Sequence, residues 1–223
     1  MLNIEALILA AGEARRFGRP KQLLPWGDGR TILSHVIETA EAAPGINTIN
    51  VVLGAWFTEI TTTLAIELQS VNVIRNPEWQ VGMFSSLKAG LNEIVNRGQN
   101  SADARNIDGI IVLLGDMPFI TTKTLNQFTD TISQSDSQPL IATEAGRPAH
   151  PYLIRPTHIG EILSLSGESG IRPFIQKEFP GARKITVEKS VGRRDIDTWP
   201  GYFENRPPDS GEVVPPPPDY DNY

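Results

Sequence analysis

The chain has 223 residues, 39% hydrophobic and 21% charged, and its 20 basic and 26 acidic side chains give a formal net charge of −6. This length suits one well-cored domain, and the acidic balance argues against nucleic acid or an anionic membrane surface as the main partner. The absence of cysteine excludes disulfides, thiolate metal sites and a cysteine nucleophile, and no apolar run approaches the ~18 residues of a membrane span.

Short β-branched segments alternate along the chain with amphipathic helical patterns. This alternation predicts right-handed βαβ crossovers and a mostly parallel sheet, with ligands bound beyond the carboxyl ends of the strands. We expect strands at 4–9, 47–53, 71–75, 108–114 and 139–143, and helices at 32–40 (capped by Thr31), 57–68, 83–95 and 121–132.

The end of the chain has a different composition. Residues 205–223 carry four acids against one arginine and include the run Pro215 to Pro218. Such a segment has little to bury, so we expect a domain over 1–204 and a disordered acidic tail over 205–223. The start of the chain lacks a secretory signal, and we therefore expect a cytoplasmic protein.

The segment after the first expected strand combines small residues with four cations. Small residues let a ligand approach the backbone amides, and a basic loop at the end of a buried strand favours a polyphosphate. A solvated basic turn is the alternative, and the spacing matches neither a P-loop nor G-x-G-x-x-G. The residues are Leu9, Ala10, Ala11 and Gly12, followed by Arg15, Arg16, Arg19 and Lys21.

Gly115-Asp116-Met117-Pro118 follows the expected strand 108–114. A carboxylate held there by flanking glycine and proline suits Mg²⁺, which takes one or two carboxylates together with substrate phosphates and waters. A capping role for Asp116 is disfavoured, because Thr121 or Thr122 is better placed to cap the next helix.

Asp195 and Asp197 lie near the end of the expected domain. In an extended segment both carboxylates point to one side and Ile196 to the other, so a second carboxylate can reach the metal. A helix cap by Asp197 or Thr198 is the competing interpretation. The two interpretations stay equal for Asp195, and for Asp197 we favour the metal.

Two further segments carry candidate contacts. Gly82 followed by Ser85 and Ser86 at a helix start offers N–H donors and hydroxyls to a phosphate, ribose or base, although capping alone would explain one serine. His150 and Pro151 lie in a turn-rich segment, where a side chain can face a ligand. We interpret His35, within the first helix, as structural.

These motifs resemble a known family. LAAGEARRFGRPK (9–21) resembles the signature LAAGxSxRxGxxK of nucleotidyltransferases with the MobA-like fold, and GDMP matches its metal-binding turn. The family often has serine at the position of Ala14, so a hydroxyl contact is lost here. Five more segments extend the resemblance to the molybdenum cofactor cytidylyltransferase branch over residues 4–204: KQLLPW (21–26), GMFSSLKAGL (82–91), GRPAHPYLI (146–154), GESGIRPFI (167–175) and DIDT (195–198).

The resemblance implies a three-layer α/β/α Rossmann-like fold and transfer of CMP from CTP to the terminal phosphate of Mo-molybdopterin, with release of pyrophosphate. It implies Arg16, Lys21 and Asp116 as catalytic residues, Mg²⁺ on Asp116 and Asp197, and the acceptor at His150 and Pro151. LAAG at 9–12 looks like the cytidylyl branch, because guanylyltransferases typically have LAGG there. The implied nucleotide-binding residues are Leu9, Ala10, Ala11, Gly12, Arg16, Lys21, Gly82, Ser85, Ser86 and Asp116.

Three alternatives stay open. One is a guanylyltransferase, or a sugar- or polyol-phosphate nucleotidyltransferase, of the same fold. Another is a nucleotide-binding insertion factor for a molybdenum hydroxylase. Such a hydroxylase is also the recipient of the product that the resemblance implies. The third is a dinucleotide-dependent dehydrogenase, which the missing G-x-G-x-x-G disfavours.

Overall fold

The computed structural model describes residues 2–100, 107–132, 137–166, 170–188, 191–192, 194–211 and 213. Strands and helices alternate along most of this part of the chain. The strands are β1 (Ile4–Leu9), β2 (Ile46–Leu53), β3 (Asn72–Arg75), β4 (Gly109–Leu114), β5 (Leu140–Glu144), β6 (Arg147–Ile154) and β7 (Arg183–Thr186). The helices are α1 (Ile32–Glu41), α2 (Phe57–Thr63), α3 (Met83–Asn100), α4 (Thr122–Thr131), α5 (Pro156–Ser164), α6 (Arg172–Glu178) and α7 (Trp199–Asn205).

The strands form one sheet in the order β3-β2-β1-β4-β6-β5-β7. The pairs β1–β2, β1–β4, β2–β3 and β5–β7 are parallel, whereas β6 runs antiparallel to both β4 and β5. The mostly parallel sheet predicted from the sequence is therefore confirmed. Because Leu9 pairs with Leu114, the segments that follow β1 and β4 leave the sheet side by side.

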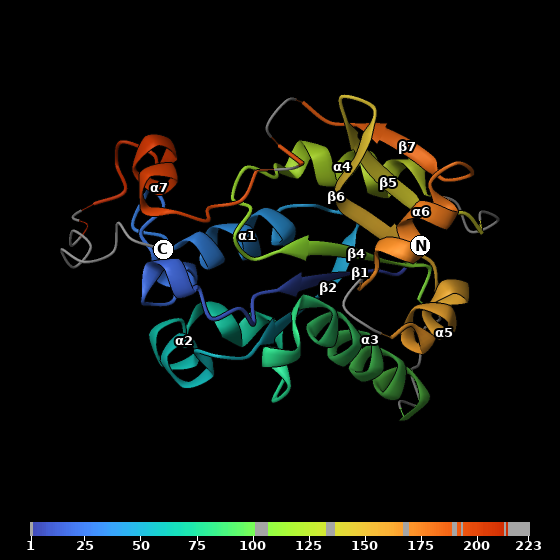
Figure 1. The fold of residues 1–223 in the computed structure, drawn as a ribbon, viewed down its shortest axis with the longest axis horizontal. Coiled ribbons are helices and arrows are strands. Elements are labelled where there is room, and N and C mark those ends of the chain that lie inside the picture. The colour runs from blue at the N-terminus through green and yellow to red at the C-terminus, as the bar shows by residue number, and fades with distance from the viewer. Residues whose placement is uncertain are drawn as a thin grey trace.

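Helices cover both faces of this sheet (Figure 1). On one face α3 packs on β1, β2 and β3 and contacts α5, and on the other α1 packs on β2 and contacts α4. β1 and β4 are buried along their whole length between these layers. Parallel strands covered on both faces appear as continuous hydrophobic runs, which is why these two were recognisable from sequence. None of the described helices is long and apolar enough to cross a bilayer.

The helix expected over 57–68 is divided. α2 ends at Thr63, and a separate 3₁₀ turn follows at Glu67–Ser70. The three consecutive threonines at 61–63 explain the early end, because β-branched side chains weaken a helix.

The turn-rich segment expected around His150 is instead most of strand β6. The chain reverses at Ala145 and Gly146, whose φ angles of 50° and 74° suit a two-residue hairpin turn between β5 and β6. The ladder jumps from Ile141↔Tyr152 to Ala142↔Ala149, so His150 and Pro151 form a bulge. Prolines inside the segment hid the strand, because proline is uncommon in strands except at edges and bulges.

A second, smaller hydrophobic cluster joins the loop after β1 to the C-terminal helix α7. Past that helix, Ser210 is buried and its hydroxyl accepts a 3.1 Å hydrogen bond from the Gly27 N–H. Ser210 therefore contacts the domain, although it lies in the segment that we expected as the tail. Past residue 211 the expected tail, except Val213, lies outside the described residues. The buried members of this second cluster are Phe17, Leu24, Trp26, Ile32, Ile196, Trp199 and Tyr202.

Candidate functional site

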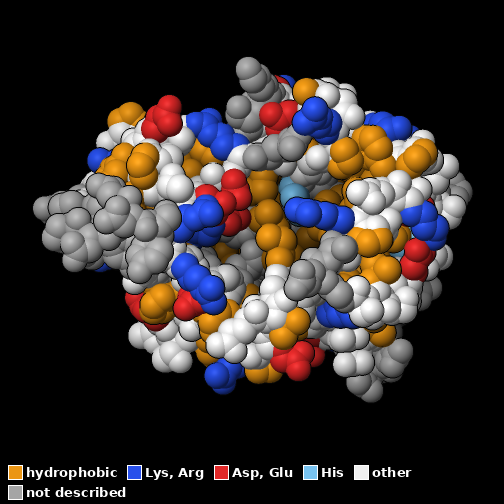
Figure 2. Space-filling model, viewed as in Figure 1, with side chains coloured by type: hydrophobic (Ala, Val, Ile, Leu, Met, Phe, Trp, Pro, Cys, Tyr) orange, Lys and Arg blue, Asp and Glu red, His pale blue; other side chains and the backbone are white. Residues whose placement is uncertain are grey.

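A cleft of about 460 Å³ lies at the carboxyl ends of β1 and β4. The loop after β1 forms one wall, the start of α3 another, and the segments around Asp116 and Asp197 a third. On the face shown in Figure 2 the molecule is hollowed near its centre, and basic and acidic side chains meet on the rim of the hollow. The cleft therefore occupies the place where parallel sheets of this kind bind ligands.

Every carbonyl from Ala10 to Ala14 is held by a donor from the protein. The Gln22 amide donates to the carbonyls of Ala10 and Gly12 at 2.9 and 3.2 Å. The carbonyls of residues 11, 13 and 14 accept from Ala55 N, Trp56 Nε1 and Phe17 N at 3.1, 2.7 and 2.8 Å. Within the described part of the chain, the N–H groups of residues 11–14 donate to no protein acceptor. The loop thus presents consecutive free amides, an arrangement that binds anions.

The glycines around the cleft serve two purposes. A Cβ on Gly12 or on Gly82 would meet nothing within 4 Å, so packing does not require either glycine, and both leave open space in the cleft. In contrast, a Cβ on Gly115 would lie 2.7 Å from the Ala10 Cβ, and one on Gly54 would lie 2.7 Å from the Ala11 carbonyl. Gly54 and Gly115 therefore allow the loop to pack closely between its neighbours.

Lys21 lies between two carboxylates. Its Nζ is 2.6 Å from Asp116 Oδ2 and 2.7 Å from Asp197 Oδ1, and its side chain is only 11% exposed. Lys21 belongs to the short 3₁₀ turn Lys21–Leu23, while the two aspartates follow β4 and precede α7. The ion pairs thus join three segments that are distant in the sequence.

The charges in this cluster shift one another's ionisation. Burial acts to lower the pKa of Lys21, but the two aspartates outweigh it and the pKa is raised, so the ammonium stays charged. Burial also acts to raise the pKa of Asp197, yet hydrogen bonding and attraction to Lys21 bring it below the ordinary value. The pKa of Asp195 is raised by burial and by the neighbouring carboxylates of Asp197 and Asp116.

The predicted alternation along 195–197 places these carboxylates. Ile196 is 1% exposed in the second hydrophobic cluster, and its N–H donates to the Asp116 carbonyl at 3.0 Å. Asp195 and Asp197 are exposed and lie with Asp116. The capping role falls to Thr198, whose hydroxyl accepts from Gly201 N at the start of α7.

The three carboxylates fit a divalent cation. One oxygen from each of Asp116, Asp195 and Asp197 lies within 4.8 Å of the others. The second oxygen of Asp116, Oδ1, is buried and has no hydrogen-bond partner, which is costly for a carboxylate that stays without a ligand. Hard cations such as Mg²⁺ and Mn²⁺ prefer such oxygen ligands.

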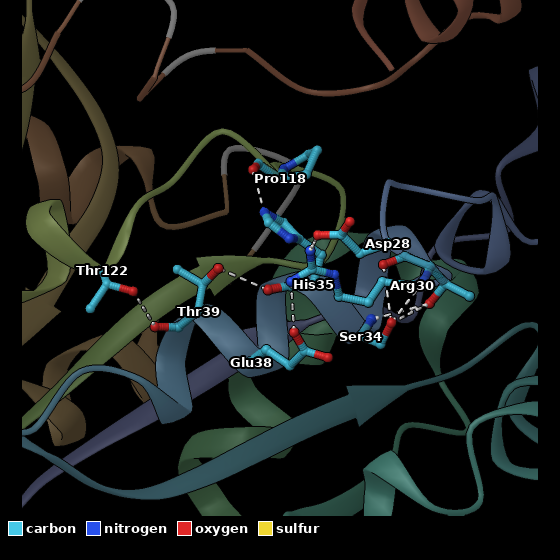
Figure 3. Close-up of polar contacts among 9 residues, drawn as sticks. Asp28, Arg30, Ser34, His35, Glu38, Thr39, Pro118 and Thr122 are labelled. Atoms are coloured by element: carbon cyan, nitrogen blue, oxygen red, sulfur yellow. Dashed lines mark hydrogen bonds and ion pairs between the residues drawn. The ribbon is translucent and has the colours of Figure 1, made fainter. Parts of the chain in front are cut away.

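Helix α1 supports the turn that carries Asp116. Figure 3 shows the His35 ring directed at Pro118, and Nε2 lies 3.1 Å from the Pro118 carbonyl. Burial, with the nearby Arg30 charge, lowers the pKa of His35, so the ring is neutral and donates through Nε2–H. The expectation of a structural His35 agrees with this contact, but its link to the turn that carries Asp116 spans 83 residues and has no local sequence signal.

Most of the predicted nucleotide-binding residues line one cleft. Ser85 is not among its lining residues; its hydroxyl lies 2.8 Å from the carbonyls of Glu78 and Gly82 and accepts from Asn76. The pattern did not single out Gln22 and Trp79, which also line the cleft. The predicted residues brought together are Leu9, Ala10, Ala11, Gly12, Arg16, Lys21, Gly82, Ser86, Asp116 and Asp197.

His150 and Pro151 are not among the residues that line this cleft. In the β6 bulge the His150 N–H donates to the Gly192 carbonyl at 2.8 Å, and its ring lies 4.6 Å from that of Tyr152. Burial lowers the pKa of His150 to about 4, and Nδ1 is buried without a hydrogen-bond partner. The ring is therefore neutral near pH 7.

Known proteins resemble the chain over most of its length. It is 29% identical over 202 residues to a nicotine blue oxidoreductase of Paenarthrobacter nicotinovorans, covering 87% of this chain and 92% of that protein. It is 28% identical over 198 residues to a molybdenum cofactor cytidylyltransferase of Escherichia coli (strain K12), covering 89% and 93%.

Solved structures agree with the fold. The crystal structure of Rv0371c from Mycobacterium tuberculosis H37Rv superposes with a TM-score of 0.73 at 26% identity, covering 91% of this chain and 97% of that one. A structure of Rv0371c in complex with manganese superposes at 0.69, with 24% identity and the same coverage. Residues 6–183 match the family model of the MobA-like NTP transferase domain, and the chain belongs to this nucleotidyltransferase family.

Proposed function

We propose that this protein is a metal-dependent cytidylyltransferase that transfers CMP from CTP to the terminal phosphate of Mo-molybdopterin and releases pyrophosphate. The observation that carries the proposal is the pairing, in one cleft, of free loop amides with a lysine-bridged carboxylate cluster. The amides suit a triphosphate and the carboxylates suit the cation that accompanies it.

The chemistry needs alignment and charge neutralisation more than a nucleophile from the protein. An oxygen of the acceptor phosphate attacks the α-phosphorus of CTP, the bond from that phosphorus to the bridging oxygen breaks, and pyrophosphate leaves with the electron pair. The amides of residues 11–14 would hold the triphosphate, while Arg16 and Lys21 would stabilise the charge that develops on it. Such a reaction needs no cysteine nucleophile, and the chain has no cysteine.

Asp116 and Asp197, with Asp195 beside them, would hold the divalent cation. When bound, Mg²⁺ neutralises phosphate charge and fixes the orientation of the phosphates. Lys21 would then be shared between the carboxylates and the triphosphate, because its ammonium carries three donors. Asp116 is best placed as the principal ligand, since its turn is tied to β1 by Gly115 N–H and to α1 by His35.

The choice of CTP rests on the LAAG form of the loop, in which Ala11 stands where guanylyltransferases typically have glycine. The choice of acceptor rests on the similarity to the E. coli cytidylyltransferase and on the GRPAHP segment. Because His150 and Pro151 do not line the nucleotide cleft, an acceptor that reached them would have to extend beyond it.

The oxidoreductase name of one relative provides the strongest competing reaction class. Hydride transfer makes no use of a divalent cation, whereas metal-assisted phosphoryl chemistry uses carboxylates to hold one beside the phosphates. The cluster therefore favours transfer of a nucleotidyl group.

The proposal is tested by pyrophosphate release with Mg²⁺ and each of CTP, GTP, ATP and UTP, with and without Mo-molybdopterin. We expect release with CTP only when the acceptor is present, and loss of release in Asp116→Asn. Asp130→Asn, an exposed change on α4, is the matched control and keeps wild-type activity.

Four outcomes would replace the proposal. Release with GTP alone would indicate a guanylyltransferase. CTP-dependent release with a sugar or polyol phosphate would change the acceptor. Tight nucleotide binding without release would indicate a delivery factor, and oxidation of a reduced nicotinamide cofactor would indicate the oxidoreductase class.

A further inference from the structure

Gln22 is buried directly beneath the loop that presents the free amides. Its side chain is carried by the 3₁₀ turn Lys21–Leu23, the residue is 2% exposed, and it lines the cleft. Its Nε2 donates to the carbonyls of Ala10 and Gly12, at 2.9 and 3.2 Å. One amide group therefore holds the carbonyls on either side of Ala11.

The placement that lets Gln22 donate these two hydrogen bonds leaves the oxygen of the same amide without a partner. Gln22 Oε1 is buried and has no hydrogen-bond partner. An unpaired buried acceptor is unfavourable, and an apolar residue of similar shape would avoid that cost. The two donated bonds are therefore the interactions that make glutamine suitable here.

The same turn controls both parts of the site. Lys21 reaches the carboxylates of Asp116 and Asp197, and its neighbour Gln22 reaches the loop backbone. The turn thus fixes the free amides relative to the carboxylate cluster. A triphosphate that binds the amides and Lys21, together with a cation held by the carboxylates, requires these groups at a constant separation.

We propose that Gln22 is a positioning residue for polyphosphate binding. By holding the carbonyls of Ala10 and Gly12 it keeps the adjacent N–H groups free for the phosphates of the nucleotide. The inference rests on the proposed function for the identity of the ligand, a nucleoside triphosphate. The amides that Gln22 positions would bind the phosphates and not the base, so the effect of Gln22 is the same for every nucleotide that binds.

The test measures dissociation constants for CTP and for inorganic tripolyphosphate by calorimetry in Gln22→Met and Gln22→Glu. Methionine keeps the size and removes the donors, and we expect both dissociation constants to rise by about 10- to 100-fold, as for other supporting contacts. In turnover, KM for CTP rises while kcat changes much less. Gln69→Met, at an exposed position, leaves both constants unchanged.

Gln22→Glu adds a pH signature that a general loss of folding would not produce. An ionised carboxylate would face two carbonyl oxygens and repel them, whereas a protonated carboxyl group donates to one of them. Burial raises the pKa of such a carboxyl group. We therefore compare the dissociation constant of each variant with that of wild type. The Gln22→Glu ratio should decrease as the pH is lowered from 8 to 6, whereas the Gln22→Met ratio should stay constant.

The outcomes separate the inference from the proposed function. If wild type binds both ligands and folded Gln22→Met binds them equally well, the positioning role is wrong. A Gln22→Glu ratio that does not change with pH would also contradict it, and this ratio decides the question if the methionine variant fails to fold. If wild type binds neither ligand, the proposed function fails instead.

Discussion

Gly12 and Gly115 follow neighbouring strands, but their missing side chains serve different purposes. A Cβ on Gly12 would enter open space in the cleft, whereas one on Gly115 would lie 2.7 Å from the Ala10 Cβ. Gly12→Ala should therefore keep the thermal midpoint of wild type and weaken CTP binding at least about tenfold, or ~1.4 kcal/mol. Gly115→Ala should lose about 1–3 kcal/mol of stability through overpacking.

Calorimetric binding and thermal unfolding of the two variants check this contrast. A Gly12→Ala variant that binds CTP as wild type does would show that the open space is not occupied by nucleotide. A destabilised Gly12→Ala variant would contradict the packing described for the loop.

Lys21 is the cation most tightly built into the site. Lys21→Met should lower the rate by roughly 10²–10³-fold, because a charge that acts mainly in the transition state is lost. Lys123→Met is the matched control, since that side chain is 79% exposed and 3.9 Å from its nearest carboxylate. Steady-state rates at saturating CTP give the comparison, and a rate within threefold of wild type would remove Lys21 from the catalytic machinery.

Stability should also depend on Lys21 at high pH. Its folded-state pKa is raised, so its stabilising contribution is present below the ordinary lysine pKa of 10.5 and is lost as the pH rises through the folded value.

At the level of secondary structure, the buried parallel strands were predictable because their hydrophobic runs and the helices between them are local patterns. β1 and β4 begin and end within one residue of the expected ranges, and Thr31 caps α1 as expected. β6 was missed because its register depends on partners in β4 and β5 and includes a bulge at His150. Tertiary pairing, which no short segment encodes, decides such a strand.

The residues of the site also divide into those that local sequence patterns predict and those that depend on the tertiary fold. Gly12, Lys21 and Asp116 belong to compact motifs that follow predicted strands, so their meeting at one edge of the sheet could be foreseen. The roles of Gln22 and His35 could not, because each side chain acts on a backbone segment placed by the fold.

His150, in the β6 bulge, should make the stability of the fold depend on pH. Burial lowers the pKa of His150 from 6.5 to about 4, so between these values the unfolded chain binds a proton that the folded chain does not. Stability should therefore fall as the pH is lowered through this window, by roughly 2–3 kcal/mol from this residue. Burial also lowers the pKa values of His35 and His158, which adds to the slope.

Urea unfolding at pH 7.5 and pH 5 measures this dependence. His150→Gln should lose less stability between the two pH values than wild type does. An equal loss in both proteins would show that His150 is not the group responsible.

Across the whole molecule, a main core and a smaller second cluster meet at the cleft. The second cluster holds Ile196 and so presents Asp195 and Asp197 beside Asp116. The chain past α7 continues this packing, because Ser210 accepts a hydrogen bond from Gly27. The C-terminal part of the domain therefore helps to build the site.

A chain that ends at residue 213 retains the contacts described here and should keep the thermal midpoint of wild type. A chain that ends at residue 204 loses the hydrogen bond and the buried contact of Ser210. Its thermal midpoint should be a few degrees lower, because each kcal/mol of lost stability lowers the midpoint by ~2–4 °C in a chain of this size. Differential scanning calorimetry compares the two. Equal midpoints would place the end of the domain at residue 204.

The most direct test of nucleotidyl transfer is to follow the label from CTP carrying ³²P at the α-phosphate, in the presence of Mg²⁺ and Mo-molybdopterin. We predict that the label enters the pterin product, with one pyrophosphate released for each CMP transferred, and that Asp116→Asn abolishes transfer while still folding. Label that stays on CTP, with folded wild-type protein and intact acceptor, would contradict the account.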